Sequence, residues 1–535
     1  MTGWGRRVLG MVVGAVLLLP AGVAAAATGA LDSSFSGDGR VRTNFGGGDR
    51  ALAVAVQPDG KLLVAGLSYR RATERQSMVV VRYLVNGEPD PGFGTDGVTV
   101  LPGAQWGFSS APVALRVRPD GRILVVASDF EVVIARLLAN GAPDPSYGDG
   151  GIATGWGTGN GTHDLLIQPD GKVLVAGETQ YSAGWVVGQL VRLLPNGERD
   201  PAFAPVDGPD DWGYGQFDAL ALQPDGRIVF SDTGVGLRRL MPNGAVDSSF
   251  GAGGLAASGV WHSAVAVQPD GRIIGLGRRL DSGATVVERW LPNGTPDRTF
   301  GVQGVRTVPL DGPYRDPTGI AVQPNGRILI AGASGATMAV VRLQPTGALD
   351  TSFGSGGVRR IAFSGATAAA AFDLALQANG RIVVAGEAIV DADSQDHDLA
   401  VARLTGDAVA ACNGKAPTIA SGEAVLHGSD GPDVIVGSLG PDVVYAGGGN
   451  DTVCTAAGND RVHGEPGADR LQGGLGNDRL EGGFGADLLL GEGGDDLLLG
   501  LADDDRLDGG TGTDHADGGA GTDTGVANET QVDVP

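Results

Sequence analysis

Short apolar runs alternate with polar turns along the chain from about residue 30 to residue 405. The runs at 51–56 and 61–65 are typical: they are rich in Val, Leu and Ala, and Pro58-Asp59-Gly60 lies between them. Proline presets φ, aspartate bonds nearby backbone and glycine adopts positive φ, so this tripeptide predicts a tight turn between two strands. Because the runs are nearly continuous instead of alternating, we expect strands that are covered on both faces.

Three signals recur seven times in a fixed order, with a period of 45 to 61 residues, which indicates a repeat architecture. The first is the turn, and the second is a strand that ends in arginine followed by an aromatic residue or leucine, as at 79–84, 340–343 and 400–404. The third is Asp-x-x-aromatic, which we interpret as a turn aspartate followed by an aromatic wedge between units. The turns end at Gly60, Gly121, Gly171, Gly226, Gly271, Gly326 and Gly380. The Asp-x-x-aromatic pairs are Asp32/Phe35, Asp90/Phe93, Asp144/Tyr147, Asp200/Phe203, Asp247/Phe250, Asp297/Phe300 and Asp350/Phe353.

The order of the signals distinguishes a closed ring from an open solenoid. The chain begins with the third signal, at Asp32, and the last repeat ends with the second, at 401–404. A ring needs this offset, because the N-terminal strand then completes the final unit, whereas a solenoid usually has distinct caps. We therefore predict an all-β fold that begins with a seven-bladed β-propeller of four strands per blade over residues 28–405. A strand near Arg40 to Phe45 is expected to join the last blade.

The units resemble the delta-60 repeats of bacterial propellers. The resemblance rests on VQPDGK-LLVAG and VRYLVNGEPDPGFGTDG within residues 56–97 and covers roughly residues 30–405. It implies the fold and little about activity. The fourth unit departs from the pattern: the segment 234–237 is short and the next turn follows after 45 residues, so one thin blade is expected there.

A second repeat, with a strict nine-residue period, occupies residues 428–526. Gly473-Gly474-Leu475-Gly476-Asn477-Asp478-Arg479-Leu480-Glu481 shows its pattern: glycine-rich turn, aspartate and one aliphatic residue. A flexible glycine-rich linker would not keep aspartates and aliphatics in register. The aspartates are Asp433, Asp442, Asp451, Asp460, Asp469, Asp478, Asp487, Asp496, Asp505, Asp514 and Asp523. The glycines two residues before them include Gly431, Gly440, Gly449, Gly458, Gly467, Gly476, Gly485 and Gly494.

This pattern resembles the RTX (hemolysin-type) calcium-binding nonapeptide repeat. The resemblance implies a right-handed parallel β-roll over residues 428–526, in which calcium lies between successive turns and the roll folds only when calcium is bound. Two nonapeptides make one coil, so aspartates 18 residues apart stack about 4.8 Å apart, where bare carboxylates repel each other. Carboxylate and carbonyl oxygens are the ligands that calcium prefers. We predict that the first ten aspartates and the eight glycines named above form the metal sites, that six to eight of nine sites bind Ca²⁺, and that the last coil frays.

The chain has two cysteines, Cys412 and Cys454, which flank the beginning of the roll. In an oxidising compartment an isolated pair favours one disulfide, and two free buried thiols are the alternative. A Cys412–Cys454 bridge would hold the strand near 417–420 over the first coils. We therefore interpret residues 406–427 as a linker and cap of the roll, and residues 527–535 as a tail.

The N-terminus has the features of a secretory signal peptide over residues 1–27. Arg6 and Arg7 precede an apolar run at 8–19, and small residues end at Ala27, the expected cleavage point. The run is short for a membrane span, although an uncleaved anchor is the alternative. We expect a secreted, extracellular protein without a transmembrane segment in the mature chain.

Charge and motifs narrow the functional classes. Residues 428–535 carry a net charge of −18 out of −24 for the chain, so most of the acidity belongs to the metal-binding segment, and a nucleic-acid partner is not expected. Nucleophile-elbow, zinc-protease, P-loop and dinucleotide motifs are absent. The polar residues before the inner strands do not repeat in position, and we interpret them mainly as loop or cap residues: His163, Asp164, Asp218, His262, Asp316 and Asp373.

These observations favour a secreted calcium-binding protein whose propeller binds an unknown extracellular ligand, a glycan or a protein, or acts as a structural scaffold. The alternative is an exported hydrolase or lyase with an active site at the propeller channel and the roll as an accessory. A surface-layer or biofilm component is a third interpretation. The sequence leaves open whether the chain is an enzyme, and the absence of catalytic motifs argues against it.

Overall fold

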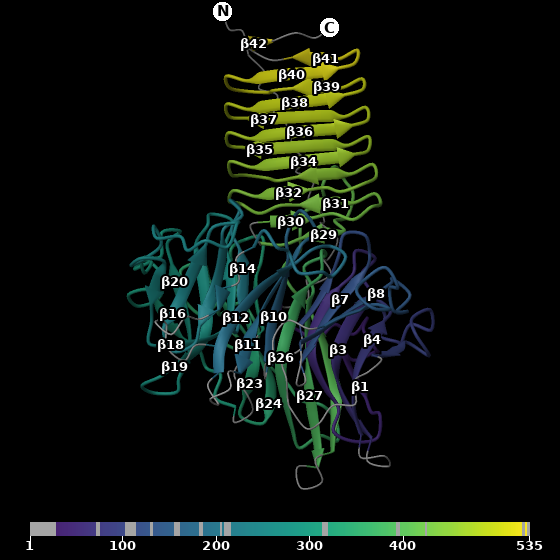
Figure 1. Cartoon of the computed structure of the whole chain (residues 1–535), viewed down its shortest axis with the longest axis vertical. Coiled ribbons are helices and arrows are strands. Elements are labelled where there is room, and N and C mark those ends of the chain that lie inside the picture. The colour runs from purple at the N-terminus through teal and green to yellow at the C-terminus, as the bar shows by residue number, and fades with distance from the viewer. Residues whose placement is uncertain are drawn as a thin grey trace, which may run out of the picture.

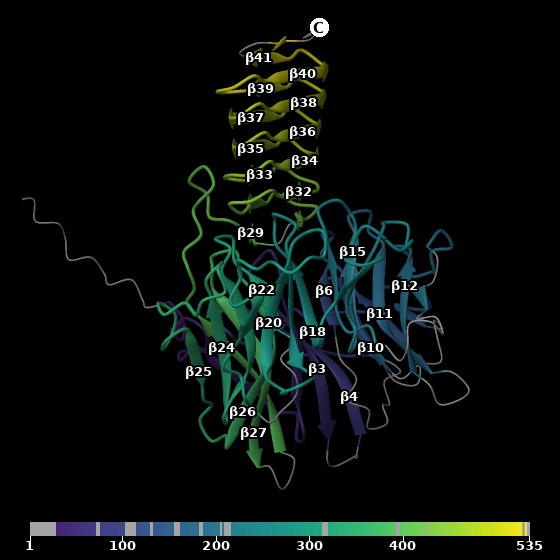
Figure 2. The same cartoon turned by 90° about the vertical axis from the view of Figure 1, so that its left-hand side faces the viewer.

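The computed structural model describes residues 28–531, apart from segments 71–74, 102–113, 129–131, 155–160, 181–185, 204–205, 208–215, 313–318, 392–395, 423–424 and 527–529. The predicted signal peptide therefore lies outside the described residues. Every regular element in the described part of the chain is a strand. This part contains no helix that is long and apolar enough to cross a membrane. Figures 1 and 2 show a broad ring of blades from which a narrow stack of coils rises.

Seven four-stranded antiparallel sheets form the ring, as the repeats predict. Blades 1 to 3 are β2–β5 (Arg50–Val56, Leu62–Arg70, Arg75–Tyr83, Val98–Val100), β6–β9 (Ala114–Val117, Ile123–Ser128, Val132–Leu137, Ile152–Thr154) and β10–β13 (Gly161–Ile167, Val173–Gln180, Val186–Leu193, Val206–Asp207). Blades 4 to 6 are β14–β17 (Leu220–Leu222, Ile228–Asp232, Gly236–Leu240, Leu255–Ala257), β18–β21 (Val260–Val267, Ile273–Arg279, Thr285–Trp290, Val305–Thr307) and β22–β25 (Gly319–Val322, Ile328–Ser334, Thr337–Leu343, Val358–Ile361). Blade 4 has short strands, as its sequence predicts. The second strands are buried along most of their length, because neighbouring blades cover both faces.

The last blade closes the ring with a strand from the other end of the chain. It consists of β26 (Ala368–Leu376), β27 (Ile382–Asp391), β28 (Asp396–Leu404) and β1 (Arg40–Thr43). β1 pairs antiparallel with β28, and Arg40 lies opposite Ala402. The predicted N-terminal closure is therefore confirmed, and β1 begins and ends close to the predicted segment.

An arginine, an aspartate and an aromatic ring recur together in every blade. In blade 1, Arg82 Nε donates to Asp90 Oδ2 at 2.8 Å, and its guanidinium carbon lies 4.6 Å from the Phe93 ring centroid. Asp90 Oδ1 accepts the Gly92 N–H at 2.9 Å, so the aspartate shapes the turn as predicted. It also neutralises a buried arginine, a role that the turn interpretation missed. The equivalent groups are Arg136/Asp144/Tyr147, Arg192/Asp200/Phe203, Arg239/Asp247/Phe250, Arg289/Asp297/Phe300, Arg342/Asp350/Phe353 and Arg403/Asp32/Phe35.

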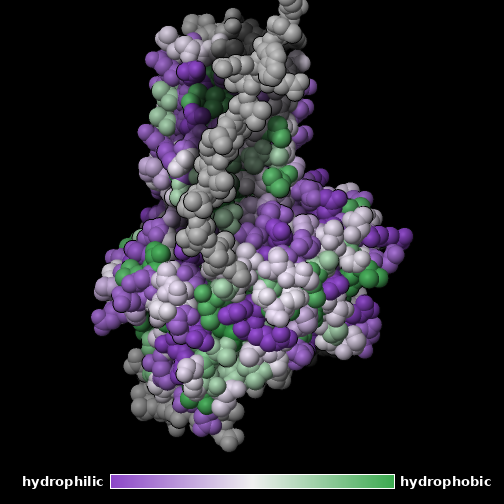
Figure 3. Space-filling model, turned by 180° about the vertical axis from the view of Figure 1, so that it is seen from behind, coloured by the Kyte–Doolittle hydropathy of each residue, from purple (hydrophilic) through white to green (hydrophobic). Residues whose placement is uncertain are grey.

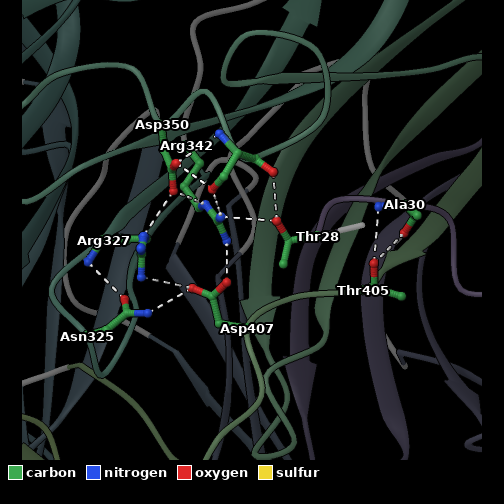
Figure 4. A network of polar contacts seen from close by, with 9 residues as sticks. Thr28, Ala30, Asn325, Arg327, Arg342, Asp350, Thr405 and Asp407 are labelled. Carbon is green, nitrogen blue, oxygen red and sulfur yellow. Dashed lines mark hydrogen bonds and ion pairs between the residues drawn. The ribbon is translucent and has the colours of Figure 1, made fainter. Parts of the chain in front are cut away.

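The same arginines connect each blade to the next, and the connection changes at the seam of the ring. In the other blades the guanidinium donates to a turn carbonyl of the following blade, such as Pro242 for Arg192. Arg342 instead donates to Asp407 Oδ1 at 2.9 Å and to Thr28 Oγ1 at 3.2 Å (Figure 4). Asn325 also donates to Asp407, at 2.8 Å. Asp407, at the start of the connection to the roll, therefore replaces the missing turn carbonyl.

The C-terminal coils form two parallel seven-stranded sheets, a β-roll. From β30 to β41, each strand pairs with the strand 18 residues later, as Val453 with Leu471. One aliphatic residue per nonapeptide, from Ile435 to Leu507, fills a narrow core between the sheets, and Ala516 extends it. The first sheet is β29 (Ile419–Ala420), β31 (Val434–Val436), β33 (Thr452–Cys454), β35 (Arg470–Leu475), β37 (Leu488–Gly493), β39 (Arg506–Asp508) and β41 (Thr524–Val526). The second is β30 (Val425–His427), β32 (Val443–Tyr445), β34 (Arg461–Pro466), β36 (Arg479–Phe484), β38 (Leu497–Ala502), β40 (His515–Ala520) and β42 (Thr530–Gln531).

The first coils of the roll lie against the Pro-Asp/Asn-Gly turns at one face of the propeller (Figure 2). Gly422 N–H donates to Val322 O at 3.0 Å and Asp430 N–H to Pro119 O at 3.3 Å. A cavity of about 260 Å³ remains between these turns, residues 407–410 and the first coils. Cys412 and Cys454 form a disulfide, as predicted, and it joins the connecting segment to β33.

Candidate calcium site

The repeated aspartates stack in two columns along the edges of the roll. From Asp451 onward, each carboxylate uses Oδ1 to accept the backbone N–H of the aspartate 18 residues earlier, as Asp487 Oδ1 does from Asp469 N–H at 2.8 Å. The same bond joins Asp478 to Asp460 and Asp505 to Asp487, also at 2.8 Å. The nine-residue spacing therefore places these side chains inward, where they are buried and in register.

The second oxygen of most of these carboxylates has no hydrogen-bond donor. Among the described residues, no partner lies within bonding distance of these Oδ2 atoms, all of which are buried. A buried anionic oxygen without a partner is costly, so it indicates a site for a cation. These atoms are Oδ2 of Asp451, Asp460, Asp469, Asp478, Asp487, Asp496, Asp505 and Asp523.

Burial in the apo roll changes the acidity of these carboxyls. Burial raises the pKa of Asp469, Asp478 and Asp505 to about 7, and it raises the pKa of Asp487 to about 6. The N–H bond from the preceding coil opposes the shift, while neighbouring carboxylates, such as Asp451 and Asp487 beside Asp469, add to it. A bound cation would reverse this effect, because it stabilises the ionised form.

The glycine that opens each outer nonapeptide leaves room beside the unpartnered oxygen. A Cβ atom on Gly491 would lie 2.3 Å from Asp496 Oδ2 and 2.5 Å from the carbonyl oxygen of Gly509, in the next coil. On Gly500 the corresponding distances would be 2.3 Å to Asp505 Oδ2 and 2.6 Å to Gly518 O. Carboxylate and carbonyl oxygens thus face one small space, and both are ligands that calcium prefers. The sequence interpretation missed these opening glycines: Gly464, Gly473, Gly482, Gly491, Gly500, Gly509 and Gly518.

The glycines that the sequence did single out lie two residues before each aspartate and serve close packing between coils. A Cβ on Gly476 would lie 1.7 Å from Gly458 O, and one on Gly485 would lie 1.8 Å from Gly467 O. Gly449, Gly458, Gly476, Gly485 and Gly494 also have left-handed φ, which favours glycine. At the base, Gly440 instead lies near Pro269 of the propeller. A ligand role for any of these eight glycines remains a prediction.

The aspartates of the first two nonapeptides are hydrogen-bonded differently. Asp433 Oδ2 accepts both the N–H and the hydroxyl of Ser429, each at 2.7 Å. Asp442 Oδ2 accepts the N–H of Ser438 at 2.7 Å and its hydroxyl at 3.2 Å. Asp433 and Asp442 therefore have donors where the outer aspartates have none.

The donor set suits calcium better than a transition metal. Among the described residues, no three His, Cys, Asp or Glu side chains converge on one point, so an ion between coils would take several ligands from backbone carbonyls. Hard oxygen ligands in a flexible number are characteristic of calcium, while zinc prefers Cys and His. The residues present therefore fit calcium.

The polar groups near the propeller channel have separate local roles. Asp373 Oδ2 accepts Val54 N–H at 2.8 Å and Asp164 Oδ2 accepts Leu220 N–H at 2.9 Å, so each carboxylate ties two neighbouring inner strands together. His262 Nε2 lies 3.0 Å from Glu288 Oε2. Asp316 lies outside the described residues.

His163 and Asp218 do come together, across blades 3 and 4. His163 Nδ1 lies 3.3 Å from Asp218 Oδ1, and Glu178 Oε2 lies 3.8 Å from His163 Nε2. Trp261 of blade 5, partly exposed, donates from Nε1 to Asp218 Oδ2 at 2.8 Å. Burial lowers the pKa of His163, but the Glu178 and Asp218 carboxylates outweigh it, so the pKa is raised.

Family comparisons agree with the two repeat systems. Residues 427–462, 455–489, 463–498 and 490–525 match the RTX calcium-binding nonapeptide repeat. The C-terminal roll is an RTX calcium-binding repeat array. Segments between residues 57 and 407 match the β-propeller domain of unknown function DUF5122, once per blade: 57–93, 118–147, 168–203, 223–250, 268–300, 323–353 and 377–407. The chain therefore joins a DUF5122 propeller to an RTX roll.

Several solved structures are similar to this chain at low sequence identity. A catalytically inactive virginiamycin B lyase from Staphylococcus aureus, crystallised with quinupristin, has 12% identity and a TM-score of 0.42, covering 68% of this chain and 98% of its own. The WD40 propeller domain of Doa1 has 13% identity and a TM-score of 0.39, covering 68% and 95%. A PQQ-bound aldose sugar dehydrogenase from Streptomyces coelicolor has 15% identity and a TM-score of 0.33, covering 68% and 98%. No curated protein matches the chain.

Proposed function

We propose that this chain is a secreted calcium-binding protein in which the RTX roll folds around Ca²⁺ and the propeller is a rigid binding or adhesion scaffold. The observation that carries the proposal is the pairing of a buried Asp Oδ2 with a carbonyl oxygen of the next coil around one small space, as at Asp496 and Gly509. The predicted signal peptide and the disulfide support export to an oxidising compartment.

Calcium would supply the stability that the core of the roll lacks. Only one aliphatic side chain per nonapeptide is buried between the sheets, which is little apolar area for each ordered residue. Stacked carboxylates at the dielectric of water repel each other by about 1 kcal/mol per pair, and more when buried. A divalent cation between coils converts this repulsion into attraction, so metal binding and folding are coupled.

The propeller would present its surface to an extracellular ligand, either a glycan or a protein. Hydrophilic residues spread over the visible described surface of ring and roll, with hydrophobic residues scattered between them (Figure 3). The Arg–Asp–aromatic groups fasten each blade to the next, so the ring suits a rigid scaffold. A glycan and protein binding screen with the full chain, in calcium and in chelator, would identify the ligand.

Calcium loading tests the proposal directly. The full chain would be stripped with chelator, dialysed against calcium and analysed for bound metal. We expect several Ca²⁺ ions per chain, and fewer in Asp469→Ala/Asp487→Ala, which loses adjacent carboxylates of one column. Asp59→Ala, in an exposed turn of the propeller, is the control and should keep the full number. Metal content near zero in the unmodified chain would refute the proposal.

A second candidate function is an exported hydrolase or lyase, which the His163–Asp218–Glu178 group favours. A histidine held between carboxylates is a general acid–base arrangement. If it acts in catalysis, His163→Gln should abolish turnover of a substrate found by screening while the propeller keeps its melting temperature. Unchanged turnover in that variant would exclude the role.

A further inference from the structure

The first four nonapeptides of the roll, residues 428–463, differ from the seven that follow. Units one and two carry serine at the second position, Ser429 and Ser438. Units three and four carry Ala446 and Thr455 at the first position, where every later unit has glycine. These substitutions lie beside the stacked aspartates, so they bear directly on which units need a metal ion.

In the first two units, the protein itself supplies donors to the carboxylate. Ser429 and Ser438 each give an N–H and a hydroxyl to Oδ2 of the aspartate four residues later. Thr418 adds its hydroxyl to Asp433 Oδ1 at 2.7 Å. The loop conformation changes as well: the second position has left-handed φ in later units, even at Glu465, while both serines are outside that region.

In units three and four, a side chain occupies the space that glycine leaves open elsewhere. In the outer units, a Cβ atom on the glycine at position one would point at Oδ2 of the aspartate in the same unit and at a carbonyl oxygen of the next coil. At Thr455 that place holds a side chain whose hydroxyl donates to Gly473 O at 2.7 Å. Gly473 O is the equivalent of the Gly509 and Gly518 carbonyls that face the open spaces. Ala446 fills the same position with a methyl group. Oδ2 of Asp451 and Asp460 nevertheless lacks a donor, as in the later units, so units three and four still favour a cation.

These four units are also the part of the roll that other segments hold in place. The Cys412–Cys454 disulfide ends in unit three, and Lys415 Nζ lies 2.9 Å from Thr452 Oγ1 in the same unit. Gly422 and Asp430 bond to propeller carbonyls. Cys412, Ala420 and Val436 form a small buried cluster that includes Ala378 of blade 7.

We propose that residues 412–445 form a metal-independent base, and that calcium sites are confined to the units that follow, residues 446–526. The roll would then assemble outward from the propeller: the base is folded before calcium arrives and serves as the template on which the outer coils stack. The inference rests on the proposed calcium-dependent folding of the roll and assigns that dependence to nine of its eleven units.

Hydrogen–deuterium exchange on the full chain tests the base and the outer coils in one experiment. In chelator we expect peptides from 446–526 to lose protection by more than about tenfold relative to the calcium-bound protein, while peptides from 425–445 keep theirs. Loss of protection from residue 428 onward would overturn the base. No loss anywhere in the roll would instead overturn calcium-dependent folding, so the two failures are distinguishable.

Variants that restore the repeat sequence test the cause. Ser429→Gly/Ser438→Gly removes the hydroxyl donors to Asp433 and Asp442, so the base should lose protection in chelator and regain it in calcium. Thr511→Ala removes a hydroxyl from an exposed position in unit ten and is the matched control, which should leave the base protected. Full protection of the base in the double glycine variant without calcium would contradict the role of these side chains.

Discussion

At the scale of single residues, the roll is governed by buried carboxylates that lack a donor. Each outer aspartate satisfies Oδ1 through the backbone of the previous coil and leaves Oδ2 facing a gap next to a glycine. The sequence was sufficient to predict that the aspartates stack in columns, because they recur with a nine-residue period. It was not sufficient to predict the opening glycines as part of the site, because many glycines of the repeat look alike until coil contacts are known.

Gly491→Ala tests the gap at one position. The new methyl group would lie 2.3 Å from Asp496 Oδ2, so it should displace the oxygen and weaken calcium binding in that part of the column by about tenfold. Gly493→Ala is the control, since its Cβ would meet neighbours at 3.4 Å without positive φ. Calcium titration calorimetry measures both, and equal affinities for the two variants would contradict the assignment.

The raised pKa values predict a dependence on pH. Burial raises the pKa of Asp469 and Asp478 to about 7, above the unfolded value near 3.8, so the metal-free roll takes up protons when it folds. The stability of the metal-free roll therefore rises as pH falls from about 7 toward 4. Calcium must displace these protons to bind, so its affinity falls over the same pH range. Titrations at pH 5.5 and 7.5 should show lower calcium affinity at the acidic value, and equal affinities would be inconsistent with it.

At the scale of elements, the blades are fastened by the Arg–Asp–aromatic groups. The strand and turn pattern predicted seven blades and their closure by β1, because local turn chemistry and apolar runs determine both. The ion pairs were not predicted: the arginine and aspartate signals were noticed separately, and only folding brings Arg403 to Asp32 from the other end of the chain. The seam through Asp407 likewise depends on a residue outside the repeats.

Asp144→Ala would test these groups in blade 2. Removing the carboxylate leaves Arg136 buried without its ionic partner, so the propeller should lose about 3 kcal/mol of unfolding free energy. Asp149→Ala, exposed in the same turn, should change it by less than about 0.5 kcal/mol. Denaturant unfolding in the presence of calcium measures both, and similar losses for both would argue against the fastening role.

At the scale of the whole molecule, a closed ring of blades carries a roll whose stability we expect to depend on bound calcium. The propeller closes on itself through β1 and β28, and it supports the base of the roll through its turns and the disulfide. The two-part organisation was predictable from two repeat periods in one sequence. The docking of the roll on the turns at one face was not, because those contacts involve few backbone groups, such as Gly422 and Val322.

Calcium titration of the full chain, followed by far-ultraviolet circular dichroism, is the most direct test of the account. The titration starts from protein stripped of metal by chelator at neutral pH, and the β-sheet signal should increase with a midpoint of about 10⁻⁴–10⁻³ M calcium. The increase should reverse when chelator is added, and an equal concentration of magnesium should not produce it. A spectrum that is the same with and without calcium over this range would show that the outer aspartates are not metal ligands whose occupation folds the roll.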